Sequence, residues 1–592
     1  MHRSLKWLYL LVPCIIMVAF VLRIWRLDVV PLRGDEAFTA IHWTNPPFSE
    51  RWLFFLEYEP NPASMVVYWA WSLGAGVSEF GLRYFSVLAN TLGAALIIAL
   101  ARRLFTRWDV ALSAGLLWAV HPFLIWHAQD ARQYGLYVTL AVLNIYLLHR
   151  ALHTKKPRWW IYVLSQTFTL YLYYFELFMV MVQALYVLVM HRKQFGRFLR
   201  VWMMIGVLLI PLAIQTYVVL FGRDYAGTAT NADFGALFTQ FIPTLFFGVP
   251  QTLLVIGLSV LLMMFILIEP MNSIRWLLGG WLLIPFILIF ALSLITSVFL
   301  PRYVIAITPA FILIITGGLS TTNWTSSRAK IERYLIFSIL IIMSLSQVYA
   351  YFYTDPPKSF DWRGLMTLVE ARSSADDVII NDTSDTALEY YHRGDINIFF
   401  IPEDNPPIEN YLPTLLDEHR SIFLLNGART GDVQIYLRSN AQRLPILWNG
   451  LEHFRKWDVD PSEIQISTDI QIGDVARLVG YSWLDNDVLL LYWEALRQTD
   501  APLNILTHFS TELNNPPVAV LDHQIAESQI STHTWQIGTV YRDPIIIPDL
   551  PDGDILLLIG MYETTPPYAR LPITQGAQDH DGRVILTQIT NK

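Results

Sequence analysis

The sequence is poor in cysteine and in charge. It has one cysteine, Cys14, among 592 residues, so no disulfide framework stabilises it. Only 15% of its residues are charged and 54% are hydrophobic, whereas soluble domains have about 25% charged residues, so the composition indicates a membrane protein. The net charge is −8 and no basic stripe is present, which argues against binding of nucleic acid. Walker and GxGxxG patterns are also missing, so no soluble nucleotide site is indicated.

Long apolar runs are present, and almost all of them lie in residues 1–353. A transmembrane helix needs roughly 17–25 mostly apolar residues. The first run has no small-x-small cleavage site after it, so we interpret it as a retained span rather than a cleaved signal. We expect eleven spans, at 7–25, 84–101, 110–126, 134–149, 159–175, 177–190, 201–221, 252–268, 276–300, 303–319 and 334–353.

The distribution of basic residues predicts the topology of these spans. With the N-terminus in the cytoplasm, the inner segments contain 17 lysines and arginines and the longer outer loops contain eight. Two further apolar stretches, 63–77 and 235–250, would invert this bias if either crossed the membrane. We therefore expect 63–77 to be a juxtamembrane helix on the outer surface and 235–250 to be a re-entrant or interfacial segment there. The predicted location is the plasma membrane, with the C-terminal region outside the cytoplasm.

The C-terminal region has the composition of soluble domains. Residues 354–460 combine a helical pattern at 362–371 with short apolar strands, which predicts a small α/β domain. From 461 to 592, strand-like runs recur between turns such as Pro551-Asp-Gly553, which predicts a β-sandwich. The expected fold is thus a polytopic helical domain, 1–353, followed by two extracytoplasmic domains.

Three charged motifs lie at the predicted outer ends of spans. They are Arg33-Gly-Asp-Glu36, the segment WHAQDARQYG at 126–135, and PRYV at 301–304. Charges beside a membrane often mark a functional site. Alone, each has an ordinary explanation: a solvated loop, a local Asp130–Arg132 ion pair, or an arginine that extends to the interface. Together they suit group transfer from an anionic, lipid-linked donor, because a carboxylate can accept a proton from a hydroxyl and arginine can bind phosphate.

Several stretches resemble one family of enzymes. "GDEAFTA", "NPASMVVYWAWSLGAGVSEFGLRYFSVLANTLGAALIIALARRLF", "HPFLIWHAQDARQYGLYVTLAVLNIYLL" and "PRYVIAITPAF" occur in the same order as motifs of the GT-C glycosyltransferases of the protein O-mannosyltransferase and lipid A aminoarabinose transferase type (glycosyltransferase family 39). The resemblance covers about 1–353. It implies a GT-C fold and transfer of a hexosyl or pentosyl group from a polyprenyl-phosphate donor to a glycan, lipid or protein acceptor, with inversion.

The resemblance also implies roles for individual residues. Asp35 would be the catalytic base, Glu36 would assist it, and Asp130 would be the second acidic residue of the site. The expected substrate-binding residues are Arg33, Glu59, Asn61, Arg132, Tyr134, Arg302 and Tyr303. No metal is required, although Glu59 and the acidic loop could bind a divalent ion.

The sequence departs from the family at one place. Many relatives have His-Pro-Pro or Glu-Lys-Pro where this chain reads Glu57-Tyr-Glu-Pro-Asn-Pro62, so the basic residue that could contact the carrier phosphate is missing. Arg302 or Arg33 would have to compensate, or the donor is bound differently. Two other classes of protein are alternatives: a flippase for lipid-linked sugars, which predicts polar groups near the bilayer midplane, and a membrane-anchored glycan receptor, which leaves most spans unexplained.

Overall fold

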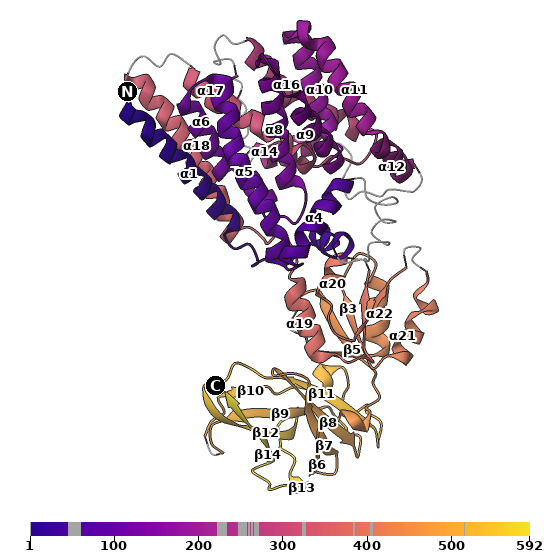
Figure 1. Cartoon of the computed structure of the whole chain (residues 1–592). Coiled ribbons are helices and arrows are strands. Elements are labelled where there is room, and N and C mark those ends of the chain that lie inside the picture. The colour runs from indigo at the N-terminus through magenta and orange to yellow at the C-terminus, as the bar shows by residue number, and fades with distance from the viewer. Residues whose placement is uncertain are drawn as a thin grey trace. The chain divides into compact units, whose positions relative to one another are not determined.

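The computed structural model describes residues 2–44, 61–221, 234–246, 257, 261, 264–265, 272–321, 327–382, 385–402, 406–446, 448–513 and 515–591. The chain divides into two compact units, Met1–Trp362 and Arg363–Lys592 (Figure 1). The first unit is helical and the second contains all the strands of the described residues.

The helices of the first unit follow the predicted apolar runs. They are α1 (His2–Ile24), α2 (Gly34–Phe38), η1 (Thr39–Trp43), α4 (Pro62–Ala75), α5 (Glu79–Phe105), α6 (Trp108–Val120), α7 (Pro122–Ala128), α8 (Tyr134–Leu152), α9 (Trp159–Leu172), α10 (Glu176–Met190), η2 (Arg192–Gln194), α11 (Phe195–Leu208), α12 (Ile210–Phe221), α13 (Phe234–Ala236), η3 (Leu237–Phe241), α14 (Ile242–Phe246), α16 (Asn272–Ser293), η4 (Pro301–Ile307), α17 (Thr308–Thr321) and α18 (Ser327–Tyr353). Every predicted span falls on one helix or on two consecutive helices, except 252–268, which lies largely outside the described residues.

Five stretches of the described residues are long and apolar enough to cross a membrane, or up to seven if each of two bent helix pairs is one span. The bent pairs are α6 with α7, at 57°, and Arg192–Leu208 with Ile210–Val218, at 51°. The count of eleven spans therefore remains a prediction. Stretch 63–77 does form a helix, α4, of 14 residues; at about 1.5 Å per residue it is shorter than the roughly 30 Å hydrocarbon core.

Helix α5 is the centre of the first unit. It packs against α6, α8 and α1, and residues on every side of it are buried. Gly93 allows this packing, because a Cβ atom there would lie 2.2 Å from the ring of Trp118 on α6. The Trp118 indole N–H donates to the Asn90 carbonyl oxygen at 3.1 Å, which fixes the same contact.

The second unit begins with a five-stranded sheet of order β2-β1-β3-β5-β4. Strands β1 and β2, and β1 and β3, are parallel, whereas β5 is antiparallel to both of its neighbours. Apolar residues of the strands and of α21 and α22 form its core. The elements are α19 (Trp362–Arg372), β1 (Val378–Asn381), α20 (Thr386–Tyr391), β2 (Asn397–Phe400), η5 (Ile408–Asn410), α21 (Leu412–Glu418), β3 (Ser421–Leu425), α22 (Gly431–Asn440), β4 (Gln442–Leu444) and β5 (Leu451–Arg455).

The remaining strands form two antiparallel sheets, of order β10-β9-β12-β14 and β11-β8-β7-β6-β13. Many of their buried residues belong to one hydrophobic cluster, which includes Trp493 from one sheet and Phe509 from the other. The elements are η6 (Pro461–Glu463), β6 (Ile466–Ile472), β7 (Ala476–Trp483), β8 (Val488–Ala495), β9 (Leu503–Ser510), β10 (Ala519–Val520), η7 (Ile525–Ser528), β11 (Val540–Ile546), β12 (Gly553–Glu563), β13 (Ile573–Gln575) and β14 (Arg583–Asn591). Helical spans followed by β-sheets thus match the predicted order of structure.

Candidate active site

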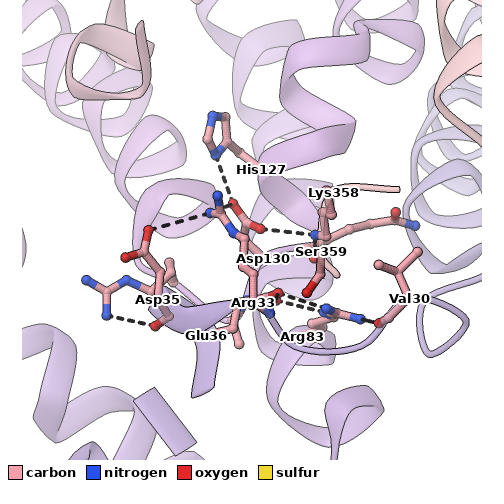
Figure 2. Close-up of polar contacts among 12 residues, drawn as sticks. Val30, Arg33, Asp35, Glu36, Arg83, His127, Asp130, Lys358 and Ser359 are labelled. Atoms are coloured by element: carbon pink, nitrogen blue, oxygen red, sulfur yellow. Dashed lines mark hydrogen bonds and ion pairs between the residues drawn. The ribbon is translucent and has the colours of Figure 1, made fainter. Parts of the chain in front are cut away.

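The acidic motif after α1 forms the short helix α2. Asp35 and Glu36 lie in its first turn, where carboxylates are favoured by the free backbone N–H groups. The Arg33 backbone N–H donates to Glu36 Oε2 at 3.3 Å, so the Glu36 side chain holds the backbone at the start of the helix. Asp35 and Glu36 are adjacent in sequence but point to different surroundings (Figure 2).

Glu36 is held in a buried ion pair with Arg83 of α5. The Arg83 Nε donates to Glu36 Oε1 at 2.7 Å and its Nη2 donates to Oε2 at 2.8 Å, while the Ala131 backbone N–H donates to Oε1 at 2.9 Å. Burial opposes ionisation, but Arg83 and Lys358 outweigh it, so the pKa of the Glu36 carboxyl is lowered. With both oxygens occupied and no exposed surface, Glu36 is a structural anchor of α2.

Asp130 lies in the turn between α7 and α8 and is also fully buried. Arg33 Nη2 donates to its Oδ2 at 2.9 Å, Lys358 Nζ donates to Oδ1 at 3.0 Å, and the His127 Nδ1 lies 3.1 Å from Oδ2. Figure 2 shows these three groups approaching the one carboxylate. Burial raises the pKa of Asp130, but the cations Arg33 and Lys358 prevail and hold it well below its usual range.

Asp35 is the most open carboxylate of the cluster, with 33% of its side chain exposed. Arg302 of η4 donates from Nη1 to Asp35 Oδ2 at 2.9 Å, and Arg33 Nη2 lies 3.9 Å from the same oxygen. Arg132 donates to the Asp35 carbonyl oxygen at 3.2 Å. Burial raises the pKa of the Asp35 carboxyl, but the guanidiniums of Arg132, Arg302 and Arg33 lower it by more, so Asp35 is ionised at neutral pH.

The cluster carries more positive than negative charge. Its carboxylates are Asp35, Glu36 and Asp130, and its cations are Arg33, Arg83, Arg132, Arg302 and Lys358. Among the described residues, the buried Nε atoms of Arg33 and Arg302 have no hydrogen-bond acceptor. Buried charge needs a partner, so the cluster is suited to an anionic ligand.

A cavity of about 460 Å³ lies beside this cluster, a size typical of ligand sites (about 300–1,000 Å³). Its lining is mainly apolar and aromatic, with Arg302, Lys358 and His127 as the basic members. The lining residues are Pro122, Phe123, Trp126, His127, Thr244, Leu300, Pro301, Arg302, Gln347, Tyr351, Asp355, Pro356 and Lys358.

The other predicted site residues are partly gathered here. Tyr134 is buried beside Arg302, whose guanidinium lies 5.8 Å from its ring and 5.8 Å from that of Tyr303. Arg132 also stacks on Trp43, at 4.5 Å. Asn61 is buried and accepts from the Tyr174 backbone N–H at 3.4 Å. Glu59 lies outside the described residues.

Two members of the cluster were missed in the sequence. Arg83 lies in α5 as the partner of Glu36, one residue before the predicted span at 84–101; its signal in the sequence is a lone arginine at the start of an apolar run. Lys358 lies beyond the predicted end of the membrane domain at 353, and nothing in its local sequence marks it. His127 belongs to the motif at 126–135, and the structure shows its contact with Asp130.

The described part of the chain contains no group of three or more His, Cys, Asp or Glu side chains placed to hold a metal ion. The carboxylates of the cluster are each paired with arginine or lysine instead.

Carboxylates and arginines collected from the ends of several apolar helices fit the resemblance of the sequence to the GT-C glycosyltransferases. The comparisons confirm this resemblance. Residues 61–221 match the family described as dolichyl-phosphate-mannose-protein mannosyltransferase, a segment that includes Arg83, Asp130 and Arg132. A comparison with curated protein sequences gives no match.

Solved structures show the same fold. The apo structure of ArnT from Cupriavidus metallidurans is 13% identical, with a TM-score of 0.53 over 76% of this chain and 98% of that one. ArnT bound to undecaprenyl phosphate gives 12% identity and a TM-score of 0.52, over 76% and 98% of the two chains. An oligosaccharyltransferase of Archaeoglobus fulgidus, tethered with an acceptor peptide, is 11% identical with a TM-score of 0.49, over 76% and 74%. At these identities the two ArnT structures show a shared fold.

Proposed function

We propose that this protein transfers a sugar from a polyprenyl-phosphate-linked donor to an acceptor hydroxyl at the outer face of the membrane. One observation carries the proposal: Asp35, the only partly exposed carboxylate of a cation-rich cluster, is bonded to Arg302, which lines the adjacent cavity. An ionised base and a phosphate-binding cation are thus side by side. The acceptor is a hydroxyl of a glycan, a lipid or a protein.

The proposed step is a single displacement with inversion. The acceptor oxygen forms a bond to the anomeric carbon of the sugar as the bond from that carbon to the phosphate oxygen breaks. The acceptor proton passes to Asp35, and the carrier leaves as polyprenyl phosphate with one more negative charge than it had in the donor. Arg302 stabilises that charge through its guanidinium N–H groups.

The lowered pKa of Asp35 makes it a weak base. A weak base accepts a proton most readily once bond formation has made the acceptor hydroxyl acidic. The electrostatic surroundings of Asp35 therefore favour proton transfer late in the step, after departure of the phosphate has begun.

Glu36 and Asp130 take positioning roles in this proposal. Both are fully buried and bonded by protein donors, so neither is open to a substrate. Glu36 fixes α2 against α5 through Arg83, and Asp130 orients Arg33 and Lys358. This differs from the roles in catalysis that the family resemblance implied for them.

The donor class rests on the fold and on the cavity. ArnT from Cupriavidus metallidurans, which has this fold, has been solved with undecaprenyl phosphate bound. The cavity combines apolar walls, which suit an isoprenoid chain, with the cations Arg302 and Lys358, which suit its phosphate. Arg33, Arg132, Tyr134 and Tyr303 would surround the donor group, and Glu59 and Asn61 remain candidates for the substrate.

The topology is part of the proposal. Basic residues concentrate in alternate connections of the first unit, which supports a cytoplasmic N-terminus and a position of the charged cluster on the outer side of the plasma membrane. The C-terminal residues 354–460 and 461–592 would then be extracytoplasmic domains that bind the acceptor or cap the membrane domain.

The replacement Asp35→Asn tests the proposed base. Sugar transfer should fall at least a hundredfold, a factor in line with general-base catalysis (about 10²–10⁴), while the protein purifies as a folded membrane protein. Asp109→Asn is a matched control, because Asp109 is paired with Arg107 and Arg333 away from the cluster and should leave transfer unchanged. Full activity of Asp35→Asn would refute the role of Asp35.

A further inference from the structure

Lys358 joins the site from outside the helical bundle. It lies on the segment that follows α18, five residues beyond Tyr353, and only 4% of its side chain is exposed. Its Nζ donates to Asp130 Oδ1 at 3.0 Å and to the Gln129 carbonyl oxygen. The neighbouring Ser359 Oγ donates to the Leu32 carbonyl oxygen at 3.1 Å, which fixes this segment against the loop before α2.

The ammonium of Lys358 has capacity for another acceptor. A lysine ammonium has three N–H donors, and the two hydrogen bonds formed by Nζ account for two of them. The same Nζ lies 5.3 Å from the centroid of the Trp126 ring, and both residues line the 460 Å³ cavity. A buried charge with a remaining donor at a cavity wall is placed to meet an anion.

We propose that Lys358 is a ligand of the carrier phosphate, and that with Arg302 it replaces the basic residue missing from the 57–62 segment. The inference rests on the proposed function, because it takes the donor to be a polyprenyl phosphate. Both cations line the cavity, and both are already paired with a carboxylate of the cluster, Lys358 with Asp130 and Arg302 with Asp35. One phosphate group bonded to Lys358 and Arg302 would hold the donor close to both Asp130 and Asp35.

The phosphate becomes more negative during the reaction, and the positive charge of Lys358 stabilises the more negative form. The phosphodiester of the donor carries one negative charge, whereas the released polyprenyl phosphate carries up to two. Lys358 therefore binds the leaving phosphate more strongly than the donor, which lowers the barrier to bond breaking. It also retains the product, so its charge affects both the rate of transfer and the release of the carrier.

The experiment measures binding by the purified full chain of two probes, undecaprenyl phosphate and the uncharged undecaprenol. Lys358→Gln keeps hydrogen-bond donors near Asp130 and Gln129 but removes the charge. It should weaken binding of undecaprenyl phosphate roughly ten- to a hundredfold, the range for a lost charge-assisted hydrogen bond, and leave binding of undecaprenol unchanged. Lys358→Arg should restore most of the preference for the phosphate, and the exposed Lys155→Gln should have no effect.

The outcomes separate the inference from the proposed function. If the unaltered chain fails to prefer undecaprenyl phosphate over undecaprenol, the donor class is wrong. If it has that preference and Lys358→Gln keeps it, Lys358 is not a phosphate ligand although the function stands. Equal weakening of both probes would show that Lys358 only supports the structure, and it too would overturn the inference. Lys358→Met provides a second uncharged variant, held to the same criterion, if the glutamine variant does not fold.

Discussion

Asp35 and Glu36 are consecutive carboxylates with different surroundings. Asp35 is one-third exposed and meets Arg302 at the edge of a cavity, whereas Glu36 is enclosed and bonded by Arg83 and the Ala131 N–H. The same chemical group is therefore partly exposed to solvent at one position and fully buried in an ion pair at the next. Neutralising Asp35 should mainly lower activity, whereas neutralising Glu36 should mainly lower stability.

Glu36→Gln should destabilise the protein. Removing one charge of a buried pair leaves Arg83 without its counterion, a loss of about 3–5 kcal/mol in comparable cases. The thermal unfolding midpoint of the purified protein should fall by several degrees, while Asp35→Asn should lower it little. A Glu36→Gln variant as stable as the unaltered chain would contradict a structural role of the Glu36–Arg83 ion pair.

The contact between His523 and Asp543 in the second unit predicts that the stability of the protein depends on pH. The His523 Nε2 lies 3.1 Å from Asp543 Oδ1 and Oδ2, and its Nδ1 faces the Leu521 carbonyl oxygen at 2.9 Å, so both nitrogens suit the protonated ring. Burial lowers the pKa of His523, but Asp543 raises it by more, to about 9. This pKa exceeds the ordinary value of 6.5, so the protonated ring stabilises the folded state. Its contribution to the free energy of unfolding is on the order of 3 kcal/mol. That contribution is complete below about pH 6.5 and is lost as the pH rises through 9.

The measurement compares thermal unfolding of the unaltered chain with that of His523→Gln across pH. The destabilisation caused by the substitution should be largest near pH 6 and should shrink towards pH 10. A difference that stays constant over this range would show that the ion pair contributes nothing.

At the scale of elements, the site depends on how α2, the turn after α7, and η4 meet. The residue types in these three motifs indicated their chemistry in the sequence, and the apolar runs indicated the helices that carry them. Their pairing could not be predicted, because Asp130 accepts from Arg33, 97 residues earlier, and from Lys358, 228 residues later. Local periodicity contains no information on such contacts between residues that lie far apart in the sequence.

Gly93 tests that packing. In Gly93→Ala the new Cβ would meet the Trp118 ring at 2.2 Å, so α5 and α6 would have to separate, at a cost of about 1–3 kcal/mol typical of overpacked cores. The unfolding midpoint should fall and transfer should decrease with it. Gly206→Ala in α11 is the matched control, because no atom lies within 4 Å of the added Cβ, and it should be neutral or slightly stabilising.

At the scale of the whole molecule, Lys358 affects how the two units can be separated. It and Ser359 belong to the first unit, which ends at Trp362, although the change in composition suggested a boundary at 353. A truncation at 353 would remove a member of the charged cluster together with the C-terminal domains. The role of those domains should therefore be tested with a cut after Trp362.

The proposed topology predicts where the chain can be labelled. In a Cys14→Ser background, Asp500→Cys in the second unit should react with a membrane-impermeant maleimide on intact cells. Lys155→Cys, in a predicted cytoplasmic loop, should react only after the membrane is permeabilised. The reverse pattern would place the charged cluster in the cytoplasm and contradict the proposed outer site.

The central claim is sugar transfer from a lipid-linked donor. Its most direct test incubates the purified full chain with a panel of polyprenyl-phosphate sugars and cell-envelope material as a source of acceptors, and measures released polyprenyl phosphate. We expect at least one donor to give release that depends on the protein and is lost in Asp35→Asn. Folded protein that releases carrier from no donor, or an Asp35→Asn variant that releases it equally well, would contradict the account.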